Sequence, residues 1–339
     1  MKKYTIKQEH IRELFKSFNN LNVLIIGDVM IDNYVFGKVG RLSPEAPVPI
    51  VNVYKKEMRP GGAANVALNV QALGANPILC SVIGADAEGI AFLDLLKKQK
   101  LSQKGILKSR NRPTTIKTRV IGNHHHLLRI DEESEEDITT NETQNLLTLI
   151  NYIIHHDKID VIIFEDYNKG LITPKLIQKV VELAKQKNIP VCVDPKKKNF
   201  HAYKSVTLFK PNLKELKDGL KIDDIDEMSI NELQKIASTY RVKQKINTLL
   251  VTLADRGVII NTRTAKYHIP AHVRKIADVS GAGDTIISVA ALCEAMRCEP
   301  FLTASLANLA GGLVCEEVGV VPINKSRLLE EALNLDFVK

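Results

Sequence analysis

The segment best suited to chemistry is Asp278-Val279-Ser280-Gly281-Ala282-Gly283-Asp284-Thr285, which leads into an apolar helical stretch over 286–296. Small residues at a helix start leave backbone N–H groups unpaired beside the positive end of the helix dipole. Gly281, Ala282 and Gly283 therefore predict an anion hole for a transferring phosphoryl group. Asp284, in the first turn, is placed to accept a hydroxyl proton. Without context, Gly-x-Gly-Asp is equally typical of an ordinary N-cap and turn.

A second glycine pair, Gly61-Gly62, opens another expected helix. The helix carries an apolar stripe at i, i+4 and i+7, formed by Val66, Val70 and Leu73. The glycines allow a ligand to approach closely, and Asn65 offers both a donor and an acceptor to sugar hydroxyls. A plain packing helix would explain the stripe, but neither Asn65 nor the double glycine.

Polar residues also follow two expected strands. Asp28 and Asp32 come after the strand at 23–26, and the carboxyl ends of parallel strands are where α/β proteins place ligands. Either carboxylate can accept hydrogen bonds from vicinal hydroxyls, although such residues are more often turn residues. Asn212-Leu213-Lys214-Glu215 has the spacing of a capping box, with Asn212 at the N-cap and Glu215 three residues later.

The elements that position these residues alternate between β-branched runs and helical stretches, which indicates a mostly parallel sheet with crossover helices. The expected strands are 23–26, 78–82, 161–164, 191–193, 207–209 and 248–251, and the clearest helices are 142–155, 174–187 and 231–240. We expect one core domain made of 1–33, 58–113 and 132–339.

Two stretches break this rhythm, 34–57 and 114–131, because each alternates apolar and β-branched residues with polar ones. Half-exposed antiparallel strands have this pattern. We predict that the two stretches form a small inserted sheet that acts as a lid and as a dimer contact. The alternative is an irregular surface excursion.

Composition excludes several classes of protein. With 45% hydrophobic and 25% charged residues and no long apolar run, the chain has no expected membrane span, and its N-terminal stretch predicts an amphipathic helix rather than a secretion signal. The five scattered cysteines argue against a disulfide framework and favour the cytoplasm. A net charge of +8 suits an acidic small substrate, since the lysines are dispersed and no nucleic-acid motif occurs. His124, His125 and His126 read as a polar turn rather than a metal site.

The two glycine motifs, in this order and some two hundred residues apart, resemble the signatures of the ribokinase-like (PfkB-type) sugar kinases. No P-loop or Gly-x-Gly-x-x-Gly fingerprint competes with this interpretation. The resemblance implies a three-layer α/β/α sandwich, ATP and Mg²⁺ as cofactors, and Asp284 as the catalytic base. It favours Asp32 first and Asp28 second for sugar binding, together with Gly61, Gly62 and Asn65.

The resemblance also implies a nucleotide site. Asn212 and Glu215 match the family's Asn-x-x-Glu element, with Glu215 tied to magnesium through water. Thr252, Gly257 and Asn308 are expected near the nucleotide base. The family often has glycine where Ala254 stands and Gly-Thr where Gly319-Val320 stands, so the adenine pocket departs from the family pattern.

Within the family, the resemblance is greatest to the heptose-7-phosphate kinases of lipopolysaccharide inner-core biosynthesis. It is carried by the segments 27–32, 41–49, 59–65, 166–170 and 194–196. The implied reaction is ATP-dependent phosphorylation of the anomeric hydroxyl of D-glycero-D-manno-heptose 7-phosphate to the 1,7-bisphosphate, in the ADP-heptose pathway. No His-x-Gly-His motif of a fused adenylyltransferase occurs, so we expect a stand-alone kinase.

A phosphorylated substrate needs cationic partners away from Asp284, and Arg129 and Lys169 are the predicted ones. Three alternatives stay open. They are a kinase of this fold for another sugar, sugar phosphate or nucleoside, a non-catalytic sugar-binding protein, and nucleic-acid binding through the basic surface.

Overall fold

Nine strands form the central sheet in the described part of the chain, residues 7–123 and 125–335 of a computed structural model. Their order is β13-β12-β11-β10-β9-β8-β1-β4-β5, and all neighbours from β5 to β11 are parallel. The parallel strands are β1 (Asn22–Gly27), β4 (Asn76–Gly84), β5 (Gly105–Ser109), β8 (Val161–Glu165), β9 (Val191–Asp194), β10 (Leu208–Phe209) and β11 (Thr248–Thr252). The antiparallel edge consists of β12 (Val258–Asn261) and β13 (Lys266–Ile269).

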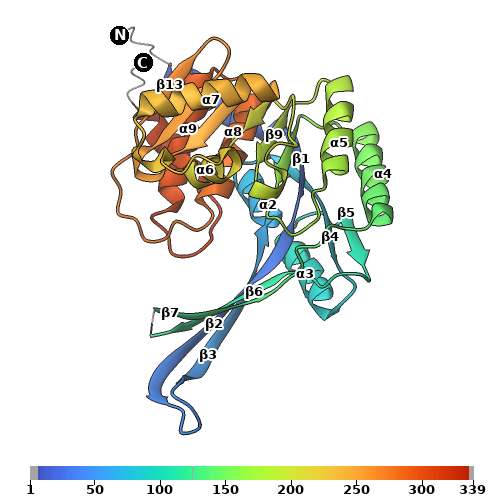
Figure 1. The fold of residues 1–339 in the computed structure, drawn as a ribbon, viewed down its shortest axis with the longest axis vertical. Helices are drawn as coiled ribbons and strands as arrows, with labels where there is room; N and C mark the ends of the chain where they lie inside the picture. Colours follow the sequence, from blue (N-terminus) through green and yellow to red (C-terminus); the bar gives the residue numbers. More distant parts are fainter. Residues whose placement is uncertain (1–6, 124, 336–339) are drawn as a thin grey trace.

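Helices cover both faces of this sheet (Figure 1). One layer contains α1 (Gln8–Ser17), α2 (Ala63–Ala72), α3 (Ala87–Lys98), α8 (Ala282–Ala295), α9 (Pro300–Val314) and α10 (Lys325–Leu333). The other contains α4 (Thr140–His156), α5 (Pro174–Gln186), α6 (Leu213–Leu220) and α7 (Ile230–Gln244). Side chains alternate along β1, so Val23 and Ile25 pack in the first core and Leu24 and Ile26 in the second. The expected three-layer sandwich is confirmed.

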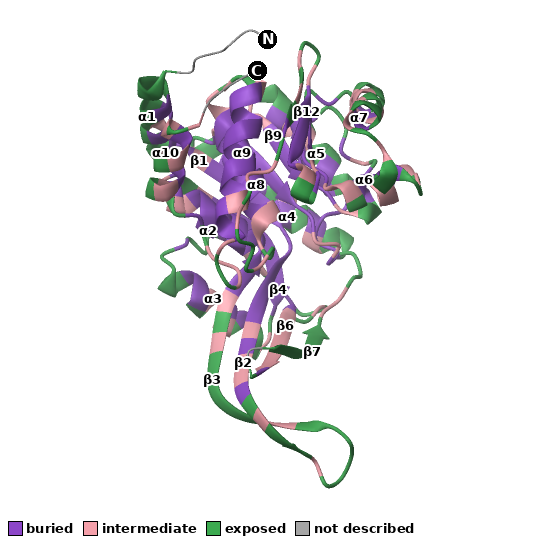
Figure 2. Ribbon diagram, turned by 90° about the vertical axis from the view of Figure 1, so that its left-hand side faces the viewer, coloured by how far each residue is buried: buried purple, intermediate pink, exposed green. Residues whose placement is uncertain are grey.

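A second sheet of four strands projects from the body (Figures 1 and 2). Its order is β3-β2-β6-β7, with bounds β2 (Val29–Leu42), β3 (Pro49–Gly62), β6 (Ile116–Gly122) and β7 (His125–Glu132). We call these four strands the lid. Strands β2 and β3 extend beyond the predicted range 34–57 at the end nearest the core, where Val29 pairs with Gly62, because the hairpin ladder continues into the core.

The alternating pairing gives the lid two unlike faces. One row across the strands contains Arg59, Asp32, Lys117 and Asp131, and the row beside it on the same face contains Glu57, Tyr34, Arg119 and Arg129. The opposite face carries Met58, Ile130 and Leu128, each about half exposed. Charged side chains therefore line one face and apolar side chains the other.

Other expectations can be compared directly. The amphipathic N-terminal helix is α1, which buries Ile11, Leu14 and Phe15. The expected turn at 124–126 is wrong for His125 and His126, which begin β7 because the ladder with β6 continues through them, and His124 lies outside the described residues. Among the described residues, none of the helices has the length and apolar character needed to span a membrane.

Candidate active site

Helix α8 begins at the Gly-Ala-Gly-Asp loop. Gly281 is its N-cap residue with φ of 81°, a left-handed conformation that glycine adopts without strain. The i to i−4 ladder starts with the amide of Thr285, 3.0 Å from the Gly281 carbonyl oxygen. The amides of Gly283 and Asp284 come before Thr285 in the first turn, so no carbonyl oxygen four residues earlier in the helix accepts from them. The loop therefore has amides available to an anion at the place where the sequence predicts an anion hole.

The Asp284 carboxylate is buried at the meeting point of three segments. Asn65 Nδ2 from α2 donates to Asp284 Oδ2 at 2.6 Å, and the hydroxyl of Tyr167, after β8, donates to Oδ1 at 2.9 Å. Burial raises the pKa of Asp284 to about 6, against these two hydrogen bonds, which lower it. Asp284 and Asn65 thus share one site, as the sequence predicts, whereas Tyr167 was not among the predicted site residues.

Two further carboxylates lie beside Asp284. Glu165 ends β8 and Asp194 ends β9, paired in register, and one oxygen from each lies within 4.8 Å of the others in the Glu165–Asp194–Asp284 group. Burial, together with Asp194 and Asp284, raises the pKa of Glu165 well above its usual value. Three of the carboxylate oxygens have no hydrogen-bond partner among the described residues. They are both side-chain oxygens of Glu165 and Oδ1 of Asp194. Orphaned buried carboxylate oxygens fit a hard cation.

Lysines offset this negative charge. Lys210 Nζ lies 2.7 Å from Asp194 Oδ2, and both side chains are buried. Burial lowers the pKa of Lys210, but Asp194 and Glu215 outweigh that effect and the net shift is upward. A Cβ atom on Gly283 would lie 3.5 Å from Lys210 Nζ, so this ammonium group stands beside the start of α8. Neither Lys210 nor Glu165 was predicted. The available signal was that both lie at the carboxyl ends of parallel strands, Glu165 at β8 and Lys210 after β10, on either side of β9.

A cleft of about 1170 Å³ runs from this cluster to the antiparallel edge of the sheet. The predicted residues that line it are Gly281, Ala282, Gly283, Asp284, Asn212, Glu215, Thr252, Gly257 and Asn308. Asn308 Nδ2 donates to the carbonyl oxygen of Pro270, and Ala254 has a left-handed φ of 53°. The fold therefore keeps a glycine-like backbone at Ala254, where the family often has glycine. The cleft is large enough for a nucleotide.

Asn212 and Glu215 do form a capping box at the start of α6. Asn212 Oδ1 accepts from the Glu215 amide, and Glu215 Oε2 accepts from the Asn212 amide, both at 2.8 Å. The remaining oxygen of Glu215 is paired with Lys196. The carboxylate predicted to hold magnesium through water is thus already engaged by two groups, while Glu165 and Asp194 retain free oxygens.

Asp32 lies on the charged face of the lid and pairs with Arg119. Gly61 leaves no room for a side chain there, since an added Cβ would collide with the Asp32 carboxylate. The guanidinium groups of Arg59 and Arg119 lie 5.1 and 5.4 Å from the ring centroid of Tyr34 and make cation–π contacts with it. Arg59 also donates to the Val320 carbonyl oxygen at 3.2 Å, which joins this face to the loop between α9 and α10.

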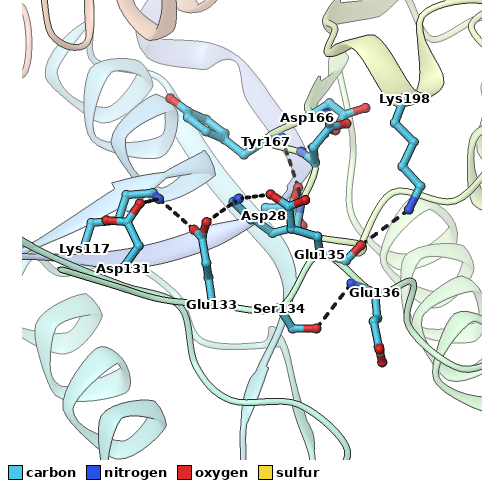
Figure 3. Close-up of polar contacts among 12 residues, drawn as sticks. Asp28, Lys117, Asp131, Glu133, Ser134, Glu135, Glu136, Asp166, Tyr167 and Lys198 are labelled. Atoms are coloured by element: carbon cyan, nitrogen blue, oxygen red, sulfur yellow. Dashed lines mark hydrogen bonds and ion pairs between the residues drawn. The ribbon is translucent and has the colours of Figure 1, made fainter. Parts of the chain in front are cut away.

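Three predicted substrate contacts differ from expectation. The buried Asp28 carboxylate accepts from the amides of Tyr167 (Figure 3), Lys169 and Leu171, so both of its oxygens are engaged in organising a loop. The ammonium of Lys169 is held by Glu133 and Glu135 at 2.7 and 2.9 Å, rather than free for a phosphate.

Arg129, the third, lies on the charged face opposite Arg119, but its side chain is 59% exposed and paired with Asp131 at 2.9 Å. Its guanidinium group is thus largely exposed to solvent and already paired with a carboxylate. Gly62, the N-cap of α2, has φ of 61° and is required as glycine for the turn from β3 into the helix.

Comparisons with known proteins agree with this geometry. Residues 20–326 match the pfkB family of carbohydrate kinases. The chain is 34% identical over 327 residues to the bifunctional protein HldE of Geobacter sulfurreducens, covering 96% of this chain and 65% of that protein. It is 37% identical over 309 residues to the bifunctional protein HldE of Koribacter versatilis, covering 91% and 62%. The chain therefore spans less than two thirds of the length of these relatives.

Solved structures show the same fold at low sequence identity. Phosphofructokinase-2 from Escherichia coli in complex with potassium superposes with a TM-score of 0.76 at 16% identity, covering 93% of this chain and 98% of that one. Ribokinase from Arabidopsis thaliana, complexed with ribose and ATP, gives a TM-score of 0.67 at 15% identity, covering 93% and 99%.

Proposed function

This chain belongs to the pfkB family of carbohydrate kinases, and from that premise we propose that it phosphorylates the anomeric hydroxyl of D-glycero-D-manno-heptose 7-phosphate with ATP. Its activity as a sugar kinase follows from the family. The acceptor rests on two observations. The relatives of 34% and 37% identity are named bifunctional protein HldE, and the lid and adjoining segments at 41–49 and 166–170 resemble heptose-7-phosphate kinases.

The observation that carries the proposed mechanism is the position of the Asp284 carboxylate. It lies in the first turn of α8, beside the amides that precede the helix ladder, and at the end of the nucleotide-sized cleft. In the proposed reaction Asp284 accepts the proton of the attacking hydroxyl, and the amides of Gly283 and Asp284, together with Lys210, stabilise negative charge on the phosphoryl group. Asn65 and Tyr167 hold the carboxylate in place.

Magnesium fits the residues that are present. The unpartnered oxygens of Glu165 and Asp194, beside Asp284, would hold the ion, with Glu215 farther out through water. When bound, Mg²⁺ supplies positive charge that neutralises the phosphate oxygens. Lys210 and Lys196 pair with the same carboxylates, so these lysines keep the acidic cluster stable.

We place the sugar between Asp284 and the charged face of the lid, with Asp32 accepting from its hydroxyls. Asn65 and the backbone at Gly61 and Gly62 border the same space. Arg119 and Arg129 lie opposite each other on this face, each beside a carboxylate, and guanidinium groups match the forked geometry of a phosphate. That arrangement supports a phosphorylated rather than a neutral sugar.

We also propose that the enzyme is a homodimer through the apolar face of the lid. Met58, Leu128 and Ile130 are 50%, 57% and 47% exposed on that face, and a second copy would cover them. The cysteines are free thiols among the described residues, which favours the reducing cytoplasm as its setting.

The test is an ATP-coupled assay with a panel of sugars. The panel contains heptose 7-phosphate, fructose 6-phosphate, fructose 1-phosphate, ribose and a nucleoside. We expect the highest kcat/KM with heptose 7-phosphate and formation of a 1,7-bisphosphate by NMR. A preference for an unphosphorylated sugar would defeat the heptose assignment and leave the sugar-kinase assignment intact.

A further inference from the structure

A short loop after β8, residues 166–171, contacts both the reaction centre and the root of the lid. At one end the Tyr167 hydroxyl donates to Asp284 at 2.9 Å. Two residues later, Lys169 Nζ lies 2.7 Å from Glu133 and 2.9 Å from Glu135. Glu133 directly follows β7, where the chain leaves the lid. One loop therefore contacts both the reaction centre and the lid, and a sugar kinase has to hold these two parts in a fixed relative position.

The backbone of this loop is locked from inside. Asp28 accepts hydrogen bonds from the amides of Tyr167, Lys169 and Leu171 at 3.0, 3.1 and 3.1 Å. On the other side, the amide of Ile138 donates to the Gly170 carbonyl oxygen at 2.9 Å. Hydrogen bonds to a charged carboxylate are among the stronger ones in proteins. The side chains of Tyr167 and Lys169 are therefore presented from a backbone that has little freedom to shift.

Glu133 joins this loop to the lid itself. One of its oxygens contacts Lys169, and the other lies 2.7 Å from Lys117 Nζ on β6 (Figure 3). The side chains of Glu133, Lys117 and Lys169 are only 18%, 13% and 10% exposed. Ion pairs this well shielded are screened less by salt than exposed pairs. Lys117 stands in the same cross-strand row as Asp32, so the connection leads to the sugar-binding face.

We propose that loop 166–171 is a brace that fixes the lid to the reaction centre, with Glu133 and Lys169 as its positioning residues. The proposal rests on the proposed function only in that Asp32 and Asp284 contact the same sugar. In this arrangement Lys169 binds the acidic segment 133–135 of its own chain, and no substrate phosphate reaches it. Loss of the pair leaves Asp284 in place but lets the lid shift against it.

The experiment tests three brace variants, Glu133→Gln, Lys169→Met and the double variant of these two. Glu136→Gln is the control. Glu136 is an exposed neighbour, and its side chain makes no ion pair within the described residues. We expect each brace variant to raise KM for the sugar about tenfold and to leave KM for ATP unchanged. The double variant is expected to raise KM by less than the product of the two single effects, because Glu133 and Lys169 share one ion pair. Lys169→Arg, which keeps the charge, restores the wild-type KM.

Hydrogen exchange without substrate supplies the second readout. Amides of β6 and β7 are expected to exchange at least several-fold faster in the brace variants than in Glu136→Gln. The brace is refuted if Glu133→Gln matches Glu136→Gln in both KM and exchange. It is also refuted if Glu133→Gln lowers KM for phosphorylated sugars alone, since that result would make Lys169 a phosphate ligand that Glu133 blocks. The hydrogen-exchange measurement needs no substrate, so it tests the brace even if the heptose assignment is wrong.

Discussion

The substitution Asp284→Asn is expected to lower turnover while it makes the protein more stable. A positioned general base contributes typically about 10²–10⁴-fold to a rate, so we expect kcat to fall by about that factor. Binding of the sugar is expected to survive, because the amide keeps the shape of the carboxylate. Stability changes in the other direction because burial raises the pKa of Asp284 to about 6, which means that the ionised form is costly in the folded state.

The size of this gain follows from the structure. A rise in pKa from 3.8 to about 6 makes ionised Asp284 cost roughly 3 kcal/mol of folding stability above pH 6. The asparagine removes that cost, but its amide nitrogen faces either Asn65 Nδ2 or the Tyr167 hydroxyl, both of which donate to Asp284. The tyrosine hydroxyl can rotate and accept, which limits the loss to about 1 kcal/mol. We expect a net gain of about 2 kcal/mol at pH 8.

The assay is urea unfolding at pH 8 and pH 4, together with steady-state kinetics. The gain should be present at pH 8 and should shrink as pH falls through 6 toward 4, where the folded carboxyl is protonated and the unfolded one is close to its own pKa of 3.8. Asp278→Asn is the matched control on the same loop, because Asp278 accepts from the amides of Ser280 and Gly319. Burial raises the pKa of Asp278, but the hydrogen bonds lower it by more and the net shift is downward. The folded state therefore favours the ionised carboxylate, and Asp278→Asn should destabilise the protein at pH 8. Turnover within tenfold of wild type, or a less stable Asp284→Asn at pH 8, would refute the reasoning.

Three further predictions address other parts of the molecule. Burial raises the pKa of Glu294 to about 7, so wild-type stability is expected to fall as pH rises from 4.5 through 7. In thermal unfolding at pH 8, Glu294→Gln should raise the free energy of unfolding by about 1–2 kcal/mol, after allowance for the partial exposure of Glu294. No difference between pH 5 and pH 8 would contradict it. Glu165→Gln should weaken Mn²⁺ binding at least tenfold by calorimetry, and unchanged affinity would remove Glu165 from the metal site. Leu128→Lys with Ile130→Lys should convert a dimer to a monomer in light scattering, whereas Lys38→Gln on the same sheet should not.

Local sequence patterns predicted most of the framework. A β-branched run located β1 and a helical stretch located α5, and the capping box predicted at Asn212 is present as side-chain hydrogen bonds. Such features depend on residues within a few positions of each other, so they can be read along the chain. The Gly-Ala-Gly-Asp loop belongs with them, because a helix start and its free amides are local properties.

Tertiary structure alone decided which distant groups meet. The carboxylates of Glu165 and Asp194 become neighbours of Asp284 only when β8, β9 and α8 come together. Asp28 looked like a ligand at a strand end, yet the loop after β8 surrounds it with three amides, and Lys169 meets acids more than thirty residues away. A charged side chain binds the nearest suitable partner in space, and that partner is set by long-range packing rather than by the residues beside it in the chain.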